Sequence, residues 1–344
     1  MDERRCGVPL SLGHRRLSRG PEVHESFRIA AVQAAPVFLD LDATMERTCE
    51  LIEEAANGGA KLIVFPEAYI PGYPLWVWFV PSGRTHPLRD LYSRLHANSI
   101  TIPGPEATRL AEVAGAFGVT VAIGVNERNS EASGSTLYNT LLYLGPDGSV
   151  LGRHRKLIPT AGERLVWGQA PGCDLEVFQL PVGRVSGLLC WENYMPLARY
   201  TLTALGQQIH VAPTWDRGEP WISTMRHTAK EGRCFVVSAC QAFHRDRIPD
   251  DLDFKAEYLA EAGEWLNPGL SLIVDPDGMI VAGPLEAEEG ILYADVRPDQ
   301  LIGPRWQLDT AGHYARPDVF DLRVNRDPRP MLRELHPETD EEGG

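Results

Sequence analysis

The stretch FRIAAVQAAPVFLDLDATMERTCELIEEAANGGAKLIVF, residues 27–65, decides the fold of this chain. Its first ten residues form a largely apolar run that is typical of a strand. Between residues 41 and 57, Met45, Ile52 and Ala56 recur at helical spacing, and the two glycines that follow end the predicted helix. The short apolar run at 61–65 has the length of a second strand. This strand–helix–strand order favours a parallel pair of strands.

The remainder of the chain continues the alternation. A loop rich in proline and tryptophan covers 66–87, and helices are predicted at about 88–98, 105–117, 197–206 and 221–232. Strands are predicted at 119–125, 137–144, 150–155, 175–180, 184–189, 209–212, 235–239, 270–274, 279–282 and 291–296. Strands that alternate with helices and also form hairpins predict an α/β protein, with mixed sheets covered by helices.

The chain is acidic and has an ordinary globular composition. Its 344 residues are 43% hydrophobic and 23% charged, with a formal net charge of −14 and a pI near 5.2. Nucleic acids and anionic membranes attract Lys and Arg, so neither is expected as a partner. No run approaches the roughly 18 apolar residues of a membrane span. We therefore expect a cytoplasmic protein.

The termini and the cysteines suggest neither secretion nor a metal site. Residues 1–26 contain several arginines but no apolar stretch of signal-peptide length, so we expect a disordered leader; a mitochondrial transit peptide is the alternative, and its acidic residues count against it. Residues 329–344 are rich in Glu and Pro and predict a disordered acidic tail. The six cysteines lack zinc-finger spacing. Without an H-E-x-x-H motif or a glycine-rich phosphate loop, no metal and no other cofactor is expected.

Cys190 lies where the apolar run of SGLLCWEN, residues 186–193, stops and the chain turns toward a helix. A cysteine at such a corner is held out of the core, and backbone N–H groups beyond it can stabilise a thiolate or an oxyanion. The position predicts a nucleophile. A buried, unreactive thiol is the alternative for any single cysteine, so the residues elsewhere in the chain must decide.

Three more polar residues follow apolar strands, where α/β folds place their chemistry. Glu67 emerges directly from the run IVFP, and burial there would raise its proton affinity, which suits a general base; a surface carboxylate is the alternative. Lys156 ends the run VLGRHRK and predicts a fixed ammonium, or else a solvated strand end. Glu163 would orient the lysine or place water, unless it pairs with Arg164 at the surface.

Longer motifs surround these residues. They read FPEAYIPGYP (65–74), HRKLIPT (154–160), CWENYMPL (190–197), APTW (212–215), AKEGRCFV (229–236) and GHYARPD (312–318). Together they closely resemble the nitrilase branch of the carbon–nitrogen hydrolase superfamily, and the likeness extends from Phe27 to about Leu332. The cysteine motif has the form typical of the members that hydrolyse nitriles.

This resemblance implies a four-layer α-β-β-α sandwich with two mixed sheets, in a single domain at 27–328 that includes a C-terminal extension. The family's Glu-Lys-Cys triad falls on Glu67, Lys156 and Cys190, and its supporting glutamate falls on Glu163. The implied activity is hydrolysis of an organic nitrile to the carboxylic acid and ammonia, with a small-molecule nitrile as substrate and no cofactor.

The expected chemistry begins from a poor electrophile, the nitrile carbon. A free thiol has a pKa near 8.5 and is only a few per cent thiolate at neutral pH, so Glu67 as base and Lys156 as cation would activate Cys190. Sulfur addition gives a thioimidate, and two waters then lead through a thioester to the acid. The Trp191 backbone N–H is expected to assist as a donor.

Aromatic residues follow both the glutamate and the cysteine. Rings occur at Tyr69, Tyr73, Trp76, Trp78, Trp191 and Tyr194. A pocket lined by such rings favours small organic nitriles over charged substrates. We predict that Tyr73, Trp191 and Tyr194 contact the substrate, although any single ring also suits core packing.

Several alternatives remain open at this point. An amidase or carbamoyl-amide hydrolase would use the same triad, and a cyanide-hydrolysing enzyme is a narrower possibility. A non-catalytic assembly protein is a separate class, which an intact triad disfavours. The resemblance implies a homodimer or a larger spiral homo-oligomer, for which the charged stretch 245–266 offers either contacts or a plain solvated loop.

Overall fold

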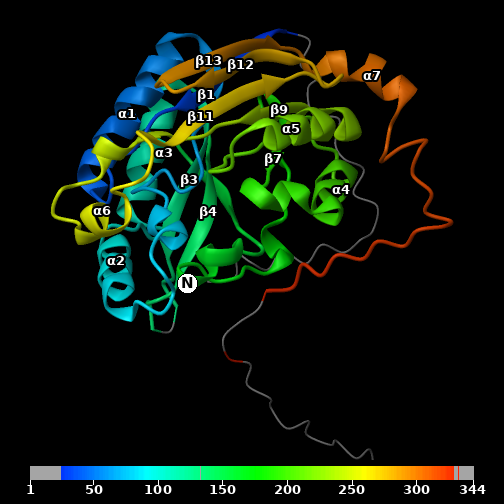
Figure 1. Ribbon diagram of the computed structural model, residues 1–344. Coiled ribbons are helices and arrows are strands. Elements are labelled where there is room, and N and C mark those ends of the chain that lie inside the picture. The colour runs from blue at the N-terminus through cyan, green and yellow to red at the C-terminus, as the bar shows by residue number, and fades with distance from the viewer. Residues whose placement is uncertain (1–24, 132, 329–331, 333–344) are drawn as a thin grey trace, which may run out of the picture.

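The structure is a computed structural model that describes residues 25–131, 133–328 and 332 (Figure 1). Two β-sheets stack against each other, and helices cover both outer faces. The predicted leader, apart from residues 25 and 26, and the predicted tail, apart from residue 332, lie outside the described residues.

The first sheet has six strands in the order β13-β1-β2-β3-β4-β5. They are β1 (Phe27–Gln33), β2 (Ala60–Val64), β3 (Thr120–Arg128), β4 (Leu137–Leu144), β5 (Val150–Arg155) and β13 (Gly290–Val296). Strand β2 runs parallel to both β1 and β3, and the other pairs are antiparallel. Helix α1 (Leu41–Asn57) connects β1 to β2, so the parallel pair predicted from residues 27–65 is confirmed.

The second sheet has seven strands in the order β10-β11-β9-β8-β7-β6, with β12 paired to β11. They are β6 (Phe178–Leu180), β7 (Gly183–Gly187), β8 (Ile209–Val211), β9 (Phe235–Ser238), β10 (Ala242–His244), β11 (Trp265–Val274) and β12 (Ile280–Glu286). The pairs β7–β8 and β8–β9 are parallel, and the remaining pairs are antiparallel. Both sheets are therefore mixed, as predicted.

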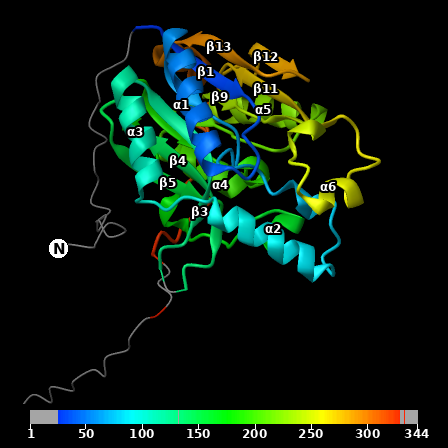
Figure 2. The ribbon, with the colours of Figure 1, turned by 90° about the vertical axis from the view of Figure 1, so that its left-hand side faces the viewer.

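Alternate side chains along a strand point into different layers of the sandwich. Along β1, Ile29 and Ala31 face the core between the sheets, whereas Ala30 and Val32 face the helices. Helices α1 and α3 (Pro105–Phe117) cover the first sheet, as Figure 2 shows, and α4 (Pro196–Ala204) and α5 (Glu219–Gly232) cover the second. The result is a four-layer α-β-β-α sandwich.

Most element boundaries agree with the sequence prediction within a few residues, but some elements differ. Helix α2 (Thr85–Ala97) begins inside the predicted loop, and β6 is a short strand preceded by a 3₁₀ turn at Gly172–Asp174. Strand β10 was not predicted, because its three residues join the sheet through pairing with β11 and give no periodic signal of their own.

The charged stretch 245–266 is not a plain solvated loop. It contains α6 (Asp253–Tyr258), and its apolar residues Ile248, Phe254 and Leu259 are buried in the cluster that includes Trp76. The charged residues of this stretch are mostly exposed, and they dominate its composition, so the composition did not reveal the buried apolar residues.

The last described segment leaves the body of the fold. Helix α7 (Ile302–Gln307) follows β13, and residues 308–328 then form no strand or helix and run along the outside of the molecule, drawn in orange to red in Figure 1. In the described part of the chain, every helix is too short or too polar to cross a membrane.

Candidate active site

Glu67 follows strand β2 and is completely buried. Its Oε1 accepts hydrogen bonds from Asn139 Nδ2 (2.7 Å) and Lys156 Nζ (2.8 Å), and its Oε2 accepts one from the Trp215 N–H (2.9 Å). Both carboxylate oxygens are therefore fixed in direction. The surface-carboxylate alternative for Glu67 is excluded.

Lys156 follows β5, and its side chain is buried between two carboxylates. Its Nζ lies 2.8 Å from Glu67 Oε1 and 2.8 Å from Glu163 Oε2. A buried ammonium needs such partners, because desolvation of a lone charge is very costly. The solvated strand end considered for this lysine is likewise excluded.

Glu163 lies in a short 3₁₀ helix, Ala161–Leu165, and is buried rather than paired with Arg164. Besides the lysine, its Oε2 accepts the Thr160 N–H (2.7 Å), and its Oε1 accepts the Tyr73 hydroxyl (2.7 Å). The Tyr73 ring stacks on Trp215 with centroids 4.5 Å apart. Glu163 thus gives the Lys156 ammonium a second carboxylate partner beside Glu67.

Cys190 lies at the corner after β7, where a 3₁₀ helix (Cys190–Tyr194) begins. Its φ of 51° is in the left-handed region, which is unfavourable for any residue with a side chain. The Cys190 N–H donates to the Pro213 carbonyl (2.9 Å), and Asn193 Nδ2 donates to the Cys190 carbonyl (2.9 Å). These bonds hold the sharp corner that the sequence predicted, but the Cys190 side chain is buried there, only 4% exposed, rather than held out of the core.

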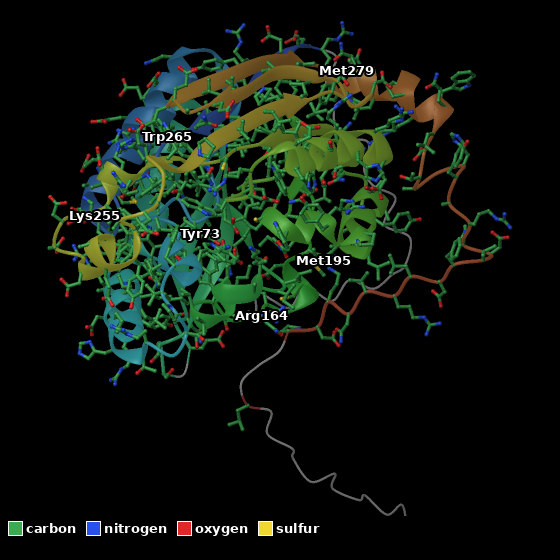
Figure 3. The ribbon with its side chains drawn as sticks, in the orientation of Figure 1. Tyr73, Arg164, Met195, Lys255, Trp265 and Met279 are labelled. Carbon is green, nitrogen blue, oxygen red and sulfur yellow. The ribbon has the colours of Figure 1, made fainter. Side chains whose placement is uncertain are left out.

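The Cys190 sulfur interacts with the same charged groups. It lies close enough to Glu67, Lys156 and Glu163 for their charges to act on the pKa of its thiol. The structure therefore brings together all four residues that the sequence proposed as catalytic. Tyr73, Arg164 and Met195, labelled in Figure 3, mark the three chain segments that carry them.

The protonation states follow from burial and from these neighbours. Burial, reinforced by the Glu163 charge, raises the pKa of Glu67 to about 7 even though Lys156 opposes the shift. Burial alone would lower the pKa of Lys156, but Glu67 and Glu163 outweigh it, so the pKa is raised well above its ordinary value. Burial and the Glu67 charge raise the pKa of Cys190 well above the ordinary thiol range.

This last shift bears on how the thiol is activated. The sequence suggested that Glu67 as base and Lys156 as cation would together activate Cys190. In the folded protein the penalty of burial and the nearby carboxylates outweigh the single ammonium, so the thiolate form of Cys190 is disfavoured. Any reaction at this sulfur therefore needs a proton acceptor, and Glu67, whose pKa is raised to about 7, is the candidate for it.

Supporting residues that the sequence did not single out hold Glu67 in place. Asn139 contacts both Glu67 and Lys156. Its side chain donates to the Glu67 carboxylate, and its backbone carbonyl accepts a hydrogen bond from the Lys156 backbone N–H (2.8 Å). Gln241 Nε2 donates to the Glu67 carbonyl (2.8 Å). Gly124 lies so close that a Cβ there would be 2.7 Å from Glu67 Cα. For Asn139, the sequence offered one signal of this role: a polar side chain within a mostly apolar strand. Gln241 and Gly124 gave no such signal.

The aromatic residues divide between the core and the site. Tyr69 packs on Phe65, and Trp76 packs within the cluster beneath α6, so neither ring faces the cysteine. Trp191 and Tyr194 are 51% and 39% exposed, and both donate hydrogen bonds to Asp216 Oδ2 (2.8 and 3.2 Å).

Within residues 25–131 and 133–328, no group of three or more His, Cys, Asp or Glu side chains is arranged to hold a metal ion. The buried charges near Cys190 instead satisfy one another. The arrangement joins a thiol, two carboxylates and an ammonium, groups that can supply a nucleophile, a base and a cation for addition to an electrophilic carbon attached to nitrogen.

The sequence matches the carbon–nitrogen hydrolase family over residues 28–303. The chain belongs to this family. It is a hydrolase that acts on carbon–nitrogen bonds. This hydrolase is 46% identical, over 305 residues, to an aliphatic nitrilase of Sinorhizobium fredii, with 88% of this chain and 97% of the relative covered.

Two further comparisons bear on this carbon–nitrogen hydrolase. It is 41% identical, over 310 residues, to a bifunctional nitrilase/nitrile hydratase of Lupinus angustifolius, with 88% of this chain and 86% of the relative covered. Its fold is similar to that of Saccharomyces cerevisiae Nit3, a member of branch 10 of the nitrilase superfamily, with a TM-score of 0.65, 18% identity, and 86% and 99% of the two chains covered. The predicted nitrilase resemblance and the predicted sandwich fold are confirmed.

Proposed function

We propose that this hydrolase is a nitrilase, which converts an organic nitrile to the carboxylic acid and ammonia, with Cys190 as nucleophile. One observation carries the proposal: Lys156 Nζ is held 2.8 Å from both Glu67 and Glu163, beside a thiol at a strained corner. The 46% identity to a protein named an aliphatic nitrilase supports the choice of substrate class.

The first step joins sulfur to the nitrile carbon. The Cys190 thiol gives its proton to Glu67 as the C–S bond forms, and Lys156 gives a proton to the nitrile nitrogen. Glu67 then returns its proton to the lysine, so the product is a neutral thioimidate. The charged pair regains its starting state.

The next steps replace nitrogen by oxygen. Water adds to the thioimidate carbon, giving a tetrahedral intermediate that bears hydroxyl, amino and sulfur groups. Protonation of the amino nitrogen lets ammonia leave, and a second water cleaves the thioester and restores the thiol. In this proposal the Trp191 backbone N–H and the Lys156 ammonium stabilise charge at the reacting atoms.

Three aromatic residues are proposed to shape the substrate site. Trp191 and Tyr194 adjoin the nucleophile, are partly exposed and would line the entrance. Tyr73 is buried, and we propose that its ring closes the inner side while its hydroxyl holds Glu163.

The test is a panel of aliphatic, aromatic and arylacetic nitriles with the matching amides and cyanide, in which ammonia, acid and amide are quantified. We expect turnover of nitriles that is lost in Cys190→Ala. Rapid amide turnover with inert nitriles would indicate an amidase instead. Activity limited to cyanide would reassign the substrate, and nitrile activity in Cys190→Ala would refute the nucleophile.

We also propose that the protein assembles as a homodimer or a larger spiral homo-oligomer and is cytoplasmic. Leu197 on α4, together with Ile302, Trp306 and Phe320 near the C-terminus, are exposed apolar residues that suit contacts between copies. Light scattering on the purified protein should give a multiple of the 38.1 kDa chain mass, and a monomer would contradict the assembly. Cell fractionation tests the location.

A further inference from the structure

Another buried carboxylate, Glu192, lies two residues after the proposed nucleophile and takes no part in the proposed chemistry. Its Oε1 accepts the Leu157 N–H (2.7 Å), and its Oε2 accepts the Leu189 N–H (2.8 Å). His154 Nε2 lies 3.0 Å from Oε2 and 3.1 Å from Oε1. Both side chains are almost completely buried.

These contacts link the two halves of the site. Leu157 directly follows Lys156, at the end of β5 in the first sheet, and Leu189 directly precedes Cys190, after β7 in the second sheet. The two strands belong to different sheets, so no strand-to-strand hydrogen bonds set the spacing between them. A single carboxylate thus bonds to the neighbours of the ammonium and of the nucleophile.

The charge state of the pair fits this role. Burial alone would lower the pKa of His154, but Glu192 outweighs that effect and raises it. Burial alone would raise the pKa of Glu192, but His154 and the two backbone N–H groups lower it. The carboxylate therefore stays ionised and accepts charge-assisted hydrogen bonds, which are stronger than neutral ones.

We propose that Glu192, held by His154, is a positioning residue that fixes Lys156 relative to the Cys190 sulfur and so controls which bond of the tetrahedral intermediate breaks. The inference rests on the proposed function, because it requires a sulfur-bound intermediate. It concerns the yield of acid over amide rather than the identity of the nucleophile.

The intermediate can collapse in two ways. If its amino nitrogen receives a proton, the C–N bond breaks, ammonia leaves and the thioester goes on to acid. If the C–S bond breaks first, the sulfur leaves and takes up a proton, the hydroxyl proton is lost, and the product is the amide. A lysine held at the nitrogen favours the first route, and a displaced lysine favours the second.

Glu192→Gln tests the proposal, because an amide keeps the size of the side chain but has only one accepting oxygen. It can serve one backbone N–H and leaves the other, together with His154, without an anionic acceptor. We expect kcat to fall by about tenfold or more with little change in KM, and the amide fraction of the product to rise several-fold.

Glu127→Gln is the matched control. Glu127 is also a buried carboxylate bonded to β5, but it accepts from Arg153 and Arg155, which alternate with His154 and Lys156 along the strand. Its loss should lower the unfolding temperature and leave the amide fraction unchanged. Measuring kcat and the amide fraction of both variants at equal folded fraction distinguishes a positioning effect from a loss of stability.

Should Glu192→Gln fail to fold, His154→Gln keeps both backbone contacts of Glu192 and should give a smaller rise in amide fraction. An unchanged amide fraction and kcat in a folded Glu192→Gln enzyme would overturn the positioning role while leaving the proposed function intact. An equal rise of amide in the Glu127 control would also overturn it. Nitrile turnover by Cys190→Ala would instead refute the proposed function itself.

Discussion

Gly124→Ala should displace Glu67 without touching any catalytic side chain. Gly124 lies on β3, and a Cβ there would be 2.7 Å from Glu67 Cα and 2.5 Å from the Ala68 nitrogen, and would also collide with the Pro66 carbonyl. Ordinary contacts of this kind need about 3.5 Å or more, so the backbone at Glu67 must move by roughly 1 Å.

The cost can be estimated from that displacement. The bond from Lys156 Nζ to Glu67 Oε1 is 2.8 Å, and a shift of about 1 Å would break it or bend it out of line. Misplacement by about 1 Å costs on the order of 100-fold in rate, or roughly 2.7 kcal/mol of activation free energy. Overpacking should in addition lower the free energy of unfolding by about 1–3 kcal/mol.

The assay is kcat for a good nitrile substrate, measured with the thermal unfolding curve of the same sample. Gly83→Ala is the control, because nothing lies within 4 Å of a Cβ at that position. It should retain the rate and stability of the parent. If Gly124→Ala also keeps its full kcat, the geometry assigned to Glu67 does not limit catalysis and the reasoning fails.

Three further predictions follow from the site. Since the pKa of Glu67 is about 7 and a base must first lose its proton, log kcat/KM should rise with pH below 7 and level off above it; a profile flat from pH 5 to 8 would contradict this. Asn139→Leu removes a hydrogen bond that lowers the pKa of Glu67, so the same rise should move to higher pH in a pH–rate titration, with Asn139→Gln as the milder comparison. Asp216→Ala frees the rings of Trp191 and Tyr194, and steady-state kinetics should show KM raised about three- to tenfold with kcat nearly unchanged; a large fall in kcat alone would argue against an entrance role.

Much of the fold could be predicted because its signals are local. The helix at Leu41–Asn57 and the strands at Leu137–Leu144 and Val150–Arg155 have the same bounds in the structure as in the prediction, since periodicity and turn residues define their ends. Strand β10 and helix α6 are short and owe their form to tertiary packing, so sequence periodicity could not reveal them.

The residues of the candidate site also separate into those with a local sequence signal and those whose role depends on tertiary contacts. Glu67 and Cys190 could be proposed because each follows an apolar run, and Lys156 because it follows the end of a strand; all three also lie in a family motif. Asn139 and Glu192 could not, because their importance depends on which backbone groups meet them across the fold. The raised pKa of Cys190 was also out of reach, since it depends on how completely the surrounding layers exclude water.

The protonated state of Cys190 bears on how long the enzyme survives in air. Peroxides oxidise thiolates far faster than thiols, and the first product, a sulfenic acid, can proceed to forms that cells do not repair. Cys190 is 4% exposed, and burial together with the Glu67 charge raises the pKa of its thiol, so both access to the sulfur and its thiolate form are disfavoured. In the proposed mechanism the proton leaves the sulfur only while a substrate occupies the place that an oxidant would need.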